Sequence, residues 1–220
     1  MHTFSRYPAP SPAAAVSFVR DNPFAVLVTS LAGAAPIATH APIVFPPGQE
    51  QGDSLVGARL WGHLGRENRH WHHFADNPEL LMVFSSSHAY VSPSSYGYTP
   101  AVPTLDYAAV HLTGRVTLLD DDGALDVVER TVEVFEDRRA SPWEMEESRH
   151  VFRRIIGGVV AFTIDIDMEQ SMFKLSQDMR PDVHARIRQD LLTGDHEHPD
   201  VAELMNRVGT CPHFAKAPDE

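Results

Sequence analysis

The sequence has 220 residues, 43% of them hydrophobic, and a formal net charge of −12 at pH 7 with the histidines neutral. This length and apolar content can bury a substantial core within one large domain. The acidic charge disfavours nucleic acid as a partner, because a broad surface for polyanions needs a basic face to displace counterions. No stretch approaches the roughly 20 apolar residues that span a bilayer, so no membrane partner is expected.

Cysteine and histidine usage set further limits. The single cysteine, Cys211, excludes an intrachain disulfide and a cysteine-rich zinc site. The first residues, MHTFSRYPAPSP, contain no apolar signal-peptide core, and a cytoplasmic location is expected. Thirteen histidines are many for this length and hint at histidine chemistry.

The first half of the chain predicts one short helix followed by strands. Residues 12–22 carry an amphipathic helical pattern that ends before Pro23, since a residue preceding proline is pushed out of the helical region. Short apolar runs predict strands at residues 25–30, 37–45, 58–63 and 80–85. Loops are expected at residues 46–54, which are rich in Pro and Gly, and at residues 85–104, which are rich in Ser, Pro and Tyr.

The second half predicts strands at 107–119 and 159–166, with Gly114 marking a bulge in the first. Apolar residues at helical spacing predict helices at 123–138, 151–156 and 183–191. Many short strands with helices at the edges indicate an α+β fold, a small barrel flanked by helices. We expect one domain over residues 1–192 and a poorly ordered polar C-terminal tail over residues 193–220.

One short motif combines an imidazole with a guanidinium. In Gly62-His63-Leu64-Gly65-Arg66, at the end of a predicted strand, His63 and Arg66 can lie beside one pocket. The planar guanidinium suits phosphate or carboxylate groups. The alternative is the solvated basic start of a helix, which such short motifs more often mark.

Other candidate groups are weaker. His70 and His73 could share a metal on a helix, but no known zinc spacing is present and solvent-exposed histidines are expected instead. Gly-x-Ser-x-Gly, Walker and G-x-G-x-x-G motifs are missing from the sequence. Tyrosines bracket the 85–104 segment and could line a flat ligand or serve ordinary packing: Tyr90, Tyr96, Tyr98 and Tyr107.

Seven short segments occur in a fixed order along nearly the whole chain: NPFA (22–25), ATHAP (38–42), GHLGR (62–66), HAYVSP (88–93), VPT (102–104), YAAVH (107–111) and KLSQ (174–177). Together they resemble the PaiB-like family, usually described as flavin-binding negative transcriptional regulators. The resemblance implies a split β-barrel like that of flavin reductases. It also implies FMN as the cofactor and a homodimer with cofactor sites near the subunit interface.

The sequence departs from the family pattern at the presumed cofactor site. Where the family has Ala-Arg-Ala-Asn-Pro, this chain has GRENR at residues 65–69, and Glu67 brings negative charge beside the presumed phosphate. The family tryptophans of Ser-Trp-Tyr and Thr-Trp-Asn-Tyr are replaced by Ser95 and Leu105. These departures resemble the heme-dependent piperazate synthases, a branch on the same scaffold. Those enzymes cyclise ornithine hydroxylated on its side-chain nitrogen, forming an N–N bond with loss of water.

Under the heme interpretation, iron acts as a Lewis acid on the departing oxygen, and residue roles follow from the resemblance. His63 is the expected axial ligand to the iron, with His40, His88 and His111 as rivals. Arg66 and Lys174 suit the heme propionates or the substrate carboxylate. A protein base must take a proton from the substrate's α-ammonium group, and Asp106 or Glu67 could receive that group. Tyrosines would flank the macrocycle or donate to the leaving oxygen: Tyr90, Tyr96 and Tyr107.

Three hypotheses therefore stand. The first is a heme b enzyme that converts an amino-acid substrate into the cyclic hydrazine L-piperazic acid. The second is an FMN-binding regulator or flavin-dependent reductase. The third is a split-barrel dimer with a vestigial site that acts through protein contacts.

Overall fold

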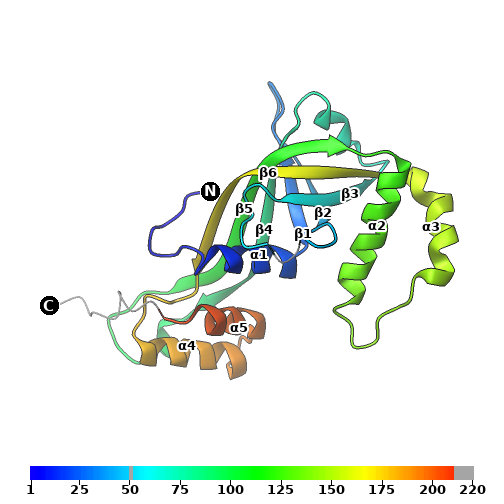
Figure 1. Cartoon of the computed structure of the whole chain (residues 1–220). Coiled ribbons are helices and arrows are strands. Elements are labelled where there is room, and N and C mark those ends of the chain that lie inside the picture. Colours follow the sequence, from blue (N-terminus) through cyan, green and yellow to red (C-terminus); the bar gives the residue numbers. More distant parts are fainter. Residues whose placement is uncertain (50–51, 211–220) are drawn as a thin grey trace. The chain divides into compact units, whose positions relative to one another are not determined.

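Six strands form a closed barrel in a computed structural model that describes residues 1–49 and 52–210. Their order around the barrel is β1-β2-β3-β6-β5-β4, and each registered pair is antiparallel. The strands are β1 (Phe24–Thr29), β2 (Ile37–Val44), β3 (Arg59–Gly65), β4 (Glu79–Val91), β5 (Thr104–Leu118) and β6 (Val159–Lys174) (Figure 1). The predicted α+β split-barrel class is confirmed.

Helices occupy the connections and both ends of the chain. The α-helices are α1 (Pro12–Asp21), α2 (Asp121–Glu136), α3 (Arg149–Ile155), α4 (Pro181–Thr193) and α5 (Pro199–Val208). The 3₁₀ helices are η1 (Arg69–Phe74), η2 (Pro93–Ser95), η3 (Glu146–Ser148) and η4 (Ile156–Gly158). Within the described residues, no helix combines the length and apolar character that crossing a membrane requires.

The chain divides into two compact units that share three long strands. The barrel unit comprises Pro12–Phe84 and Val110–Gln170. Within the described residues, the pocket unit comprises Met1–Ser11, Ser85–Ala109 and residues 171–210. Because β4, β5 and β6 each run from one unit into the other, each contributes one part to the barrel unit and the remaining part to the pocket unit.

Alternation of apolar side chains builds the barrel unit. In β1 the burial alternates along the strand, and Leu27 lies opposite Thr39 of β2 and Met82 of β4. The same alternation in β3 buries Leu60 and Leu64, which pair with Ile164 and Val160 of β6. Every second side chain of a strand points to the same face, so the apolar residues of neighbouring strands form one continuous interior. Its fully buried members include Leu27, Ile43, Leu60, Leu80, Met82, Phe84, Leu112, Phe162 and Ile164.

Local signals in the sequence explain the helices of the barrel unit. In α1 the apolar residues of the predicted stripe are buried: Ala15, Val16, Phe18 and Val19. Helix α2 begins after Asp120, whose side chain accepts a hydrogen bond from the Gly123 amide at 3.0 Å. Asp121 and Asp122 in its first turn favour the positive end of the helix dipole.

The pocket unit corrects the expectation of a polar, poorly ordered tail. Residues 199–208 form α5, which contacts α4 and buries Val201, Ala202 and Met205. These apolar residues share one face of the helix, a short pattern hidden among charged residues. The remaining part of the predicted tail, residues 211–220 with Cys211, lies outside the described residues.

Two strands extend beyond their predicted ends. The segment 85–104 was expected to be a loop, yet β4 continues to Val91 and η2 follows it. Likewise β6 runs eight residues past the predicted end at Ile166, to Lys174. Serine and charged residues obscure the alternation in both segments, and the pairing of the long strands decides their conformation instead. Gly114 lies within the continuous strand β5 and serves close backbone approach, since a Cβ there would lie 2.3 Å from the Asp165 carbonyl oxygen of β6.

Candidate functional site

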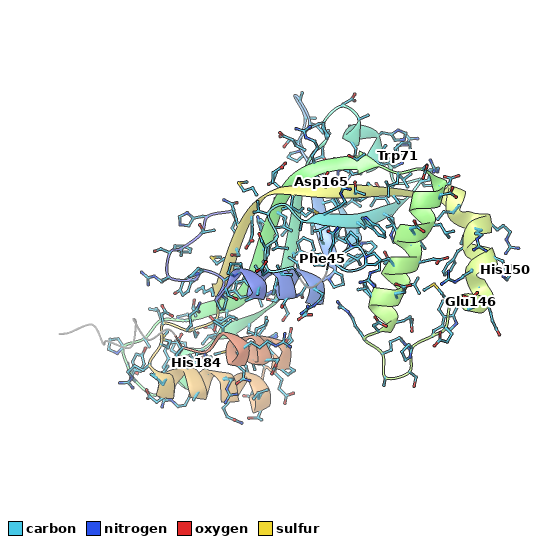
Figure 2. The ribbon with its side chains drawn as sticks, in the orientation of Figure 1. Phe45, Trp71, Glu146, His150, Asp165 and His184 are labelled. Carbon is cyan, nitrogen blue, oxygen red and sulfur yellow. The ribbon has the colours of Figure 1, made fainter. Side chains whose placement is uncertain are left out.

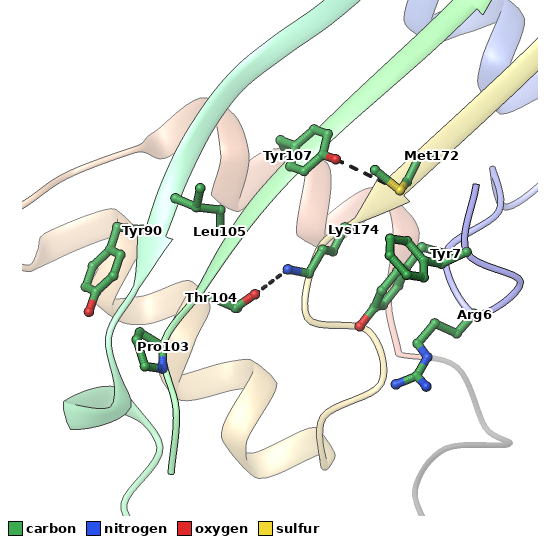
Figure 3. Close-up of a pocket in the computed structure, with 10 residues that line it drawn as sticks. Arg6, Tyr7, Tyr90, Pro103, Thr104, Leu105, Tyr107, Met172 and Lys174 are labelled. Atoms are coloured by element: carbon green, nitrogen blue, oxygen red, sulfur yellow. Dashed lines mark hydrogen bonds between the residues drawn. The ribbon is translucent and has the colours of Figure 1, made fainter. Parts of the chain in front are cut away.

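A pocket of about 780 Å³ opens within the pocket unit (Figure 3). Four segments that are far apart in the sequence build it: the N-terminal residues, the end of β4, the start of β5 and the end of β6. Its lining residues are Phe4, Arg6, Tyr7, Tyr90, Pro103, Thr104, Leu105, Tyr107, Met172 and Lys174. The volume is in the range of small-molecule and cofactor sites.

Strand alternation decides which residues reach this pocket. Leu105 and Tyr107 are two apart on β5 and both line it, as do Met172 and Lys174 on β6. Asp106 lies between the two lining residues of β5 and faces the opposite side, because successive side chains of a strand point to opposite faces. Its carboxyl group is fully buried.

Lys174 is the distinctive cation of the pocket. It is half-buried, and its Nζ donates a hydrogen bond to the Thr104 hydroxyl (Figure 3). It forms no ion pair within the part of the chain that the structure describes. The sequence contains only one other lysine, Lys216, because arginine supplies nearly all of its positive charge. A half-buried ammonium group whose direct hydrogen-bond partner is neutral favours an anionic ligand.

Aromatic side chains form much of the remaining wall. The Tyr107 hydroxyl contacts the Met172 sulfur at 4.0 Å. On the N-terminal segment, Phe4 and Tyr7 meet edge to face with ring centroids 6.2 Å apart. Tyr90 is 57% exposed, so its ring is accessible to a ligand. Flat rings around the cationic side chains of Lys174 and Arg6 suit a planar, conjugated molecule that carries an anionic group.

Asp178 fixes the N-terminal segment at the pocket. It accepts a hydrogen bond from the Tyr7 hydroxyl at 2.9 Å and lies 4.0 Å from the Arg6 guanidinium. Burial, together with the hydrogen bond and charge of Asp178, raises the pKa of Tyr7 to about 12. The Phe173 amide also donates to the Tyr7 carbonyl oxygen at 2.9 Å. Tyr7 therefore stays a neutral donor at physiological pH.

Two predicted catalytic residues do not line the pocket. Tyr96 and Asp106 were expected to act on the substrate, but they are 1% and 0% exposed and neither is among the lining residues. Both are instead buried in the pocket unit, where Asp106 interacts electrostatically with Tyr96 and is stabilised in its ionised form by Ser176. Lys174, Tyr90 and Tyr107, also predicted, do lie in the pocket.

The candidate axial histidines lie outside the pocket lining. In the barrel unit, His63 on β3 pairs with Ala161 of β6, and its buried Nδ1 has no hydrogen-bond partner among the described residues. Burial lowers the pKa of His63, so its imidazole is neutral. His40 is exposed and stacks on Phe24 with centroids 5.7 Å apart.

The two remaining rival histidines differ in exposure. His88 is exposed in β4, whereas His111 is half-buried in β5. Burial lowers the pKa of His111.

Arg66 has a structural role in the barrel unit. Its guanidinium donates to the carbonyl oxygens of Gly157 at 2.5 Å and Val159 at 2.8 Å, and it lies 3.9 Å from Asp121. Trp71 of η1 (Figure 2) donates from Nε1 to the Arg66 carbonyl oxygen at 3.0 Å. Arg66 therefore connects the end of β3 to the start of β6 through hydrogen bonds from two of its guanidinium nitrogens.

The expectation of exposed histidines in η1 is wrong for His70. Its ring is fully buried, with Nδ1 3.0 Å from the Thr39 hydroxyl and Nε2 2.9 Å from the Thr29 hydroxyl. Burial lowers the pKa of His70, and a neutral ring suits these two hydroxyl partners. Across residues 1–49 and 52–210, no group of three or more His, Cys, Asp or Glu residues is placed to hold a metal ion.

Comparison with known proteins decides the family. A family described as "Putative FMN-binding domain" matches residues 1–168. The chain is 31% identical over 194 residues to the protease synthase and sporulation protein PAI 2 of Bacillus subtilis, covering 86% of this chain and 88% of that protein. The chain belongs to the PaiB-like FMN-binding family.

Solved structures share its fold at low sequence identity. A conserved hypothetical protein from Mycobacterium tuberculosis is similar with a TM-score of 0.55 and 13% identity, over 79% of this chain and 91% of that one. A FAD and heme binding protein from Mycobacterium smegmatis is similar with a TM-score of 0.51 and 14% identity, over 72% and 69%. At such identities the likeness concerns the split barrel alone.

Several pocket residues were not predicted from the sequence. Phe4, Arg6 and Tyr7 belong to a segment without regular structure, and Met172 lies in the unpredicted extension of β6. The family pattern offered a signal only for other lining residues: its VPT and KLSQ segments contain Pro103, Thr104 and Lys174.

Proposed function

We propose that this PaiB-like protein binds FMN in the pocket of the pocket unit and acts as a flavin-dependent reductase of small molecules. The observation that carries the proposal is Lys174, a half-buried cation that forms no direct ion pair in the described structure, set in a wall of aromatic side chains. FMN combines a flat conjugated ring with a phosphate, and the pocket offers a matching surface for each.

The pocket residues divide the work of holding such a cofactor. Tyr90 and Tyr107 offer ring faces and edges to the isoalloxazine, and Leu105 and Met172 offer apolar contact. Lys174 provides a point charge for the phosphate, with Arg6 as a second cation on the pocket wall. Bound FMN would supply hydride transfer. The acidic charge of the chain favours a reductase over a regulator that binds DNA directly. A homodimer is part of the proposal.

Absorption spectroscopy tests the cofactor. Protein purified after expression with both riboflavin and hemin supplied is expected to show flavin bands and no Soret band. Tyr107→Ala should lower FMN occupancy several-fold, because the ring loses a wall of its site. Tyr98→Ala changes a tyrosine outside the lining and is the matched control. Stoichiometric heme with no FMN would contradict the proposal.

A second candidate is the heme-dependent piperazate synthase, and His63 favours it. Its buried Nδ1 is neutral and lacks a partner, as an unoccupied ligand atom would. Heme iron would supply Lewis-acid activation of the hydroxylamine oxygen. The replacement of family tryptophans by Ser95 and Leu105 also points away from a flavin ring site.

Two results would select this second candidate. The first is a Soret band that His63→Ala abolishes while the fold is retained, with His150→Ala, at an exposed histidine of α3, as the matched control. The second is anaerobic conversion of side-chain N-hydroxylated ornithine to a product one water lighter. Conversion should need neither NADH nor dioxygen, because the cyclisation is redox-neutral.

A further inference from the structure

Three buried polar side chains of the pocket unit make no hydrogen bond of standard geometry within the described residues: the carboxyl group of Asp106 and the hydroxyls of Tyr96 and Ser176. The hydroxyl and amide of Ser176 still lie near enough to the Asp106 carboxyl group to favour its ionised form. The three residues are at most 3% exposed. An unpartnered carboxylate in such surroundings is costly, and a bound proton removes much of the cost.

The charges around Asp106 connect this group to the pocket. Lys174, which lines the pocket, stabilises the ionised form of Asp106, and Ser176 acts in the same direction. Burial and the carboxylate of Asp178 oppose ionisation, so that the pKa of Asp106 is raised to about 6. In turn, the charge of Asp106 contributes to raising the pKa of Tyr96. Asp106 thus lies behind the pocket strand and interacts with the pocket cation.

An anion bound to Lys174 would change this balance. Its negative charge would offset the ammonium group that favours ionised Asp106, and would also repel the carboxylate. Both effects raise the affinity of Asp106 for a proton. By linkage, the pocket must then bind the anion more tightly when Asp106 is protonated than when Asp106 is ionised.

We propose that Asp106 is a positioning residue that controls how strongly Lys174 holds an anionic ligand, by taking up a proton from behind the pocket as the anion binds. The inference rests on the part of the proposed function that makes this pocket a ligand site, and it does not depend on the ligand being FMN. Tyr96 and Ser176 supply the enclosed hydroxyls beside which that proton is held.

The test uses 8-anilinonaphthalene-1-sulfonate, a planar fluorescent anion whose sulfonate charge is constant across the range studied. Lowering the pH from about 7.5 to about 5 is expected to tighten its binding to the protein by about tenfold, the effect of a one-unit pKa change in Asp106. Calorimetry in buffers of different ionisation enthalpy should show net proton uptake near pH 6. Asp106→Asn should bind tightly at both pH values and take up no proton.

Controls separate this account from its alternatives. Asp122→Asn removes an exposed carboxylate on α2 and should keep the wild-type pH profile. Lys174→Met should bind the probe weakly with no pH dependence. The proposal would be overturned if the affinity of Asp106→Asn for the probe still rose about tenfold between about pH 7.5 and about pH 5.

A ligand-free measurement covers the case in which Asp106→Asn fails to fold. Carboxyl carbon NMR of the wild-type protein should show one aspartate titrating near pH 6, and Lys174→Met should move that titration to higher pH. An aspartate signal that does not respond to Lys174→Met would overturn the coupling. The protein could show both the pH-dependent probe binding and the titration shift and yet bind no FMN. That result would reject the proposed cofactor and leave the coupling between Asp106 and Lys174 intact.

Discussion

Replacing Lys174 with methionine is expected to lower the affinity for FMN by about ten- to a hundredfold, because a charge-assisted contact of about 1.5–3 kcal/mol is lost. Methionine keeps most of the side-chain length and apolar volume, so the pocket wall is retained. Thr104, the hydrogen-bond partner of Lys174, remains half-exposed to solvent and can be hydrated. Quenching of FMN fluorescence by the titrated protein measures the change.

Arg115→Met provides the matched control. It removes the same unit of charge from an exposed position on β5 outside the pocket lining. Its affinity for FMN should stay within about twofold of the wild type, because exposed charges are screened by solvent and salt. Equal affinities for wild type and Lys174→Met would show that Lys174 does not bind the phosphate.

Replacing Gly114 with alanine is expected to destabilise the barrel by about 3 kcal/mol, at the upper end of overpacking effects. The added Cβ would lie 2.3 Å from the Asp165 carbonyl oxygen and 2.9 Å from a methyl group of Ile164. The first of these atoms is backbone of β6, so it cannot be relieved by a rotamer change. Urea unfolding followed by circular dichroism measures the loss.

Gly65→Ala is the control for this substitution. Gly65 also lies in a strand, β3, but its added Cβ would meet no atom within 4 Å. Its stability should change by no more than about 0.5 kcal/mol. Similar urea midpoints of unfolding for Gly114→Ala and Gly65→Ala would refute the close approach of β5 and β6.

Much of the fold could be predicted because its signals are local. Helix α1 ends before Pro23, and α2 follows a capping aspartate, Asp120. The continuation of β4 to Val91 and of β6 to Lys174 could not be predicted, because pairing with distant strands determines it. Helix α5 was missed because its apolar face is short and lies within a charged segment.

The candidate site was only partly predictable. Lys174, Tyr90 and Tyr107 follow from the family pattern and lie in the pocket. Asp106 does not line the pocket, because adjacent residues Asp106 and Tyr107 point to opposite faces of β5, which the sequence alone does not reveal. Arg66 was expected at a cofactor, whereas tertiary contacts to backbone carbonyl oxygens occupy it.

The most direct test of the central claim is a crystal structure of the protein grown with FMN. The account predicts the isoalloxazine ring against Tyr107 and Tyr90, with the phosphate within hydrogen-bond distance of the Lys174 ammonium group. FMN bound at Arg66 and His63, with the pocket of Lys174 empty, would contradict it.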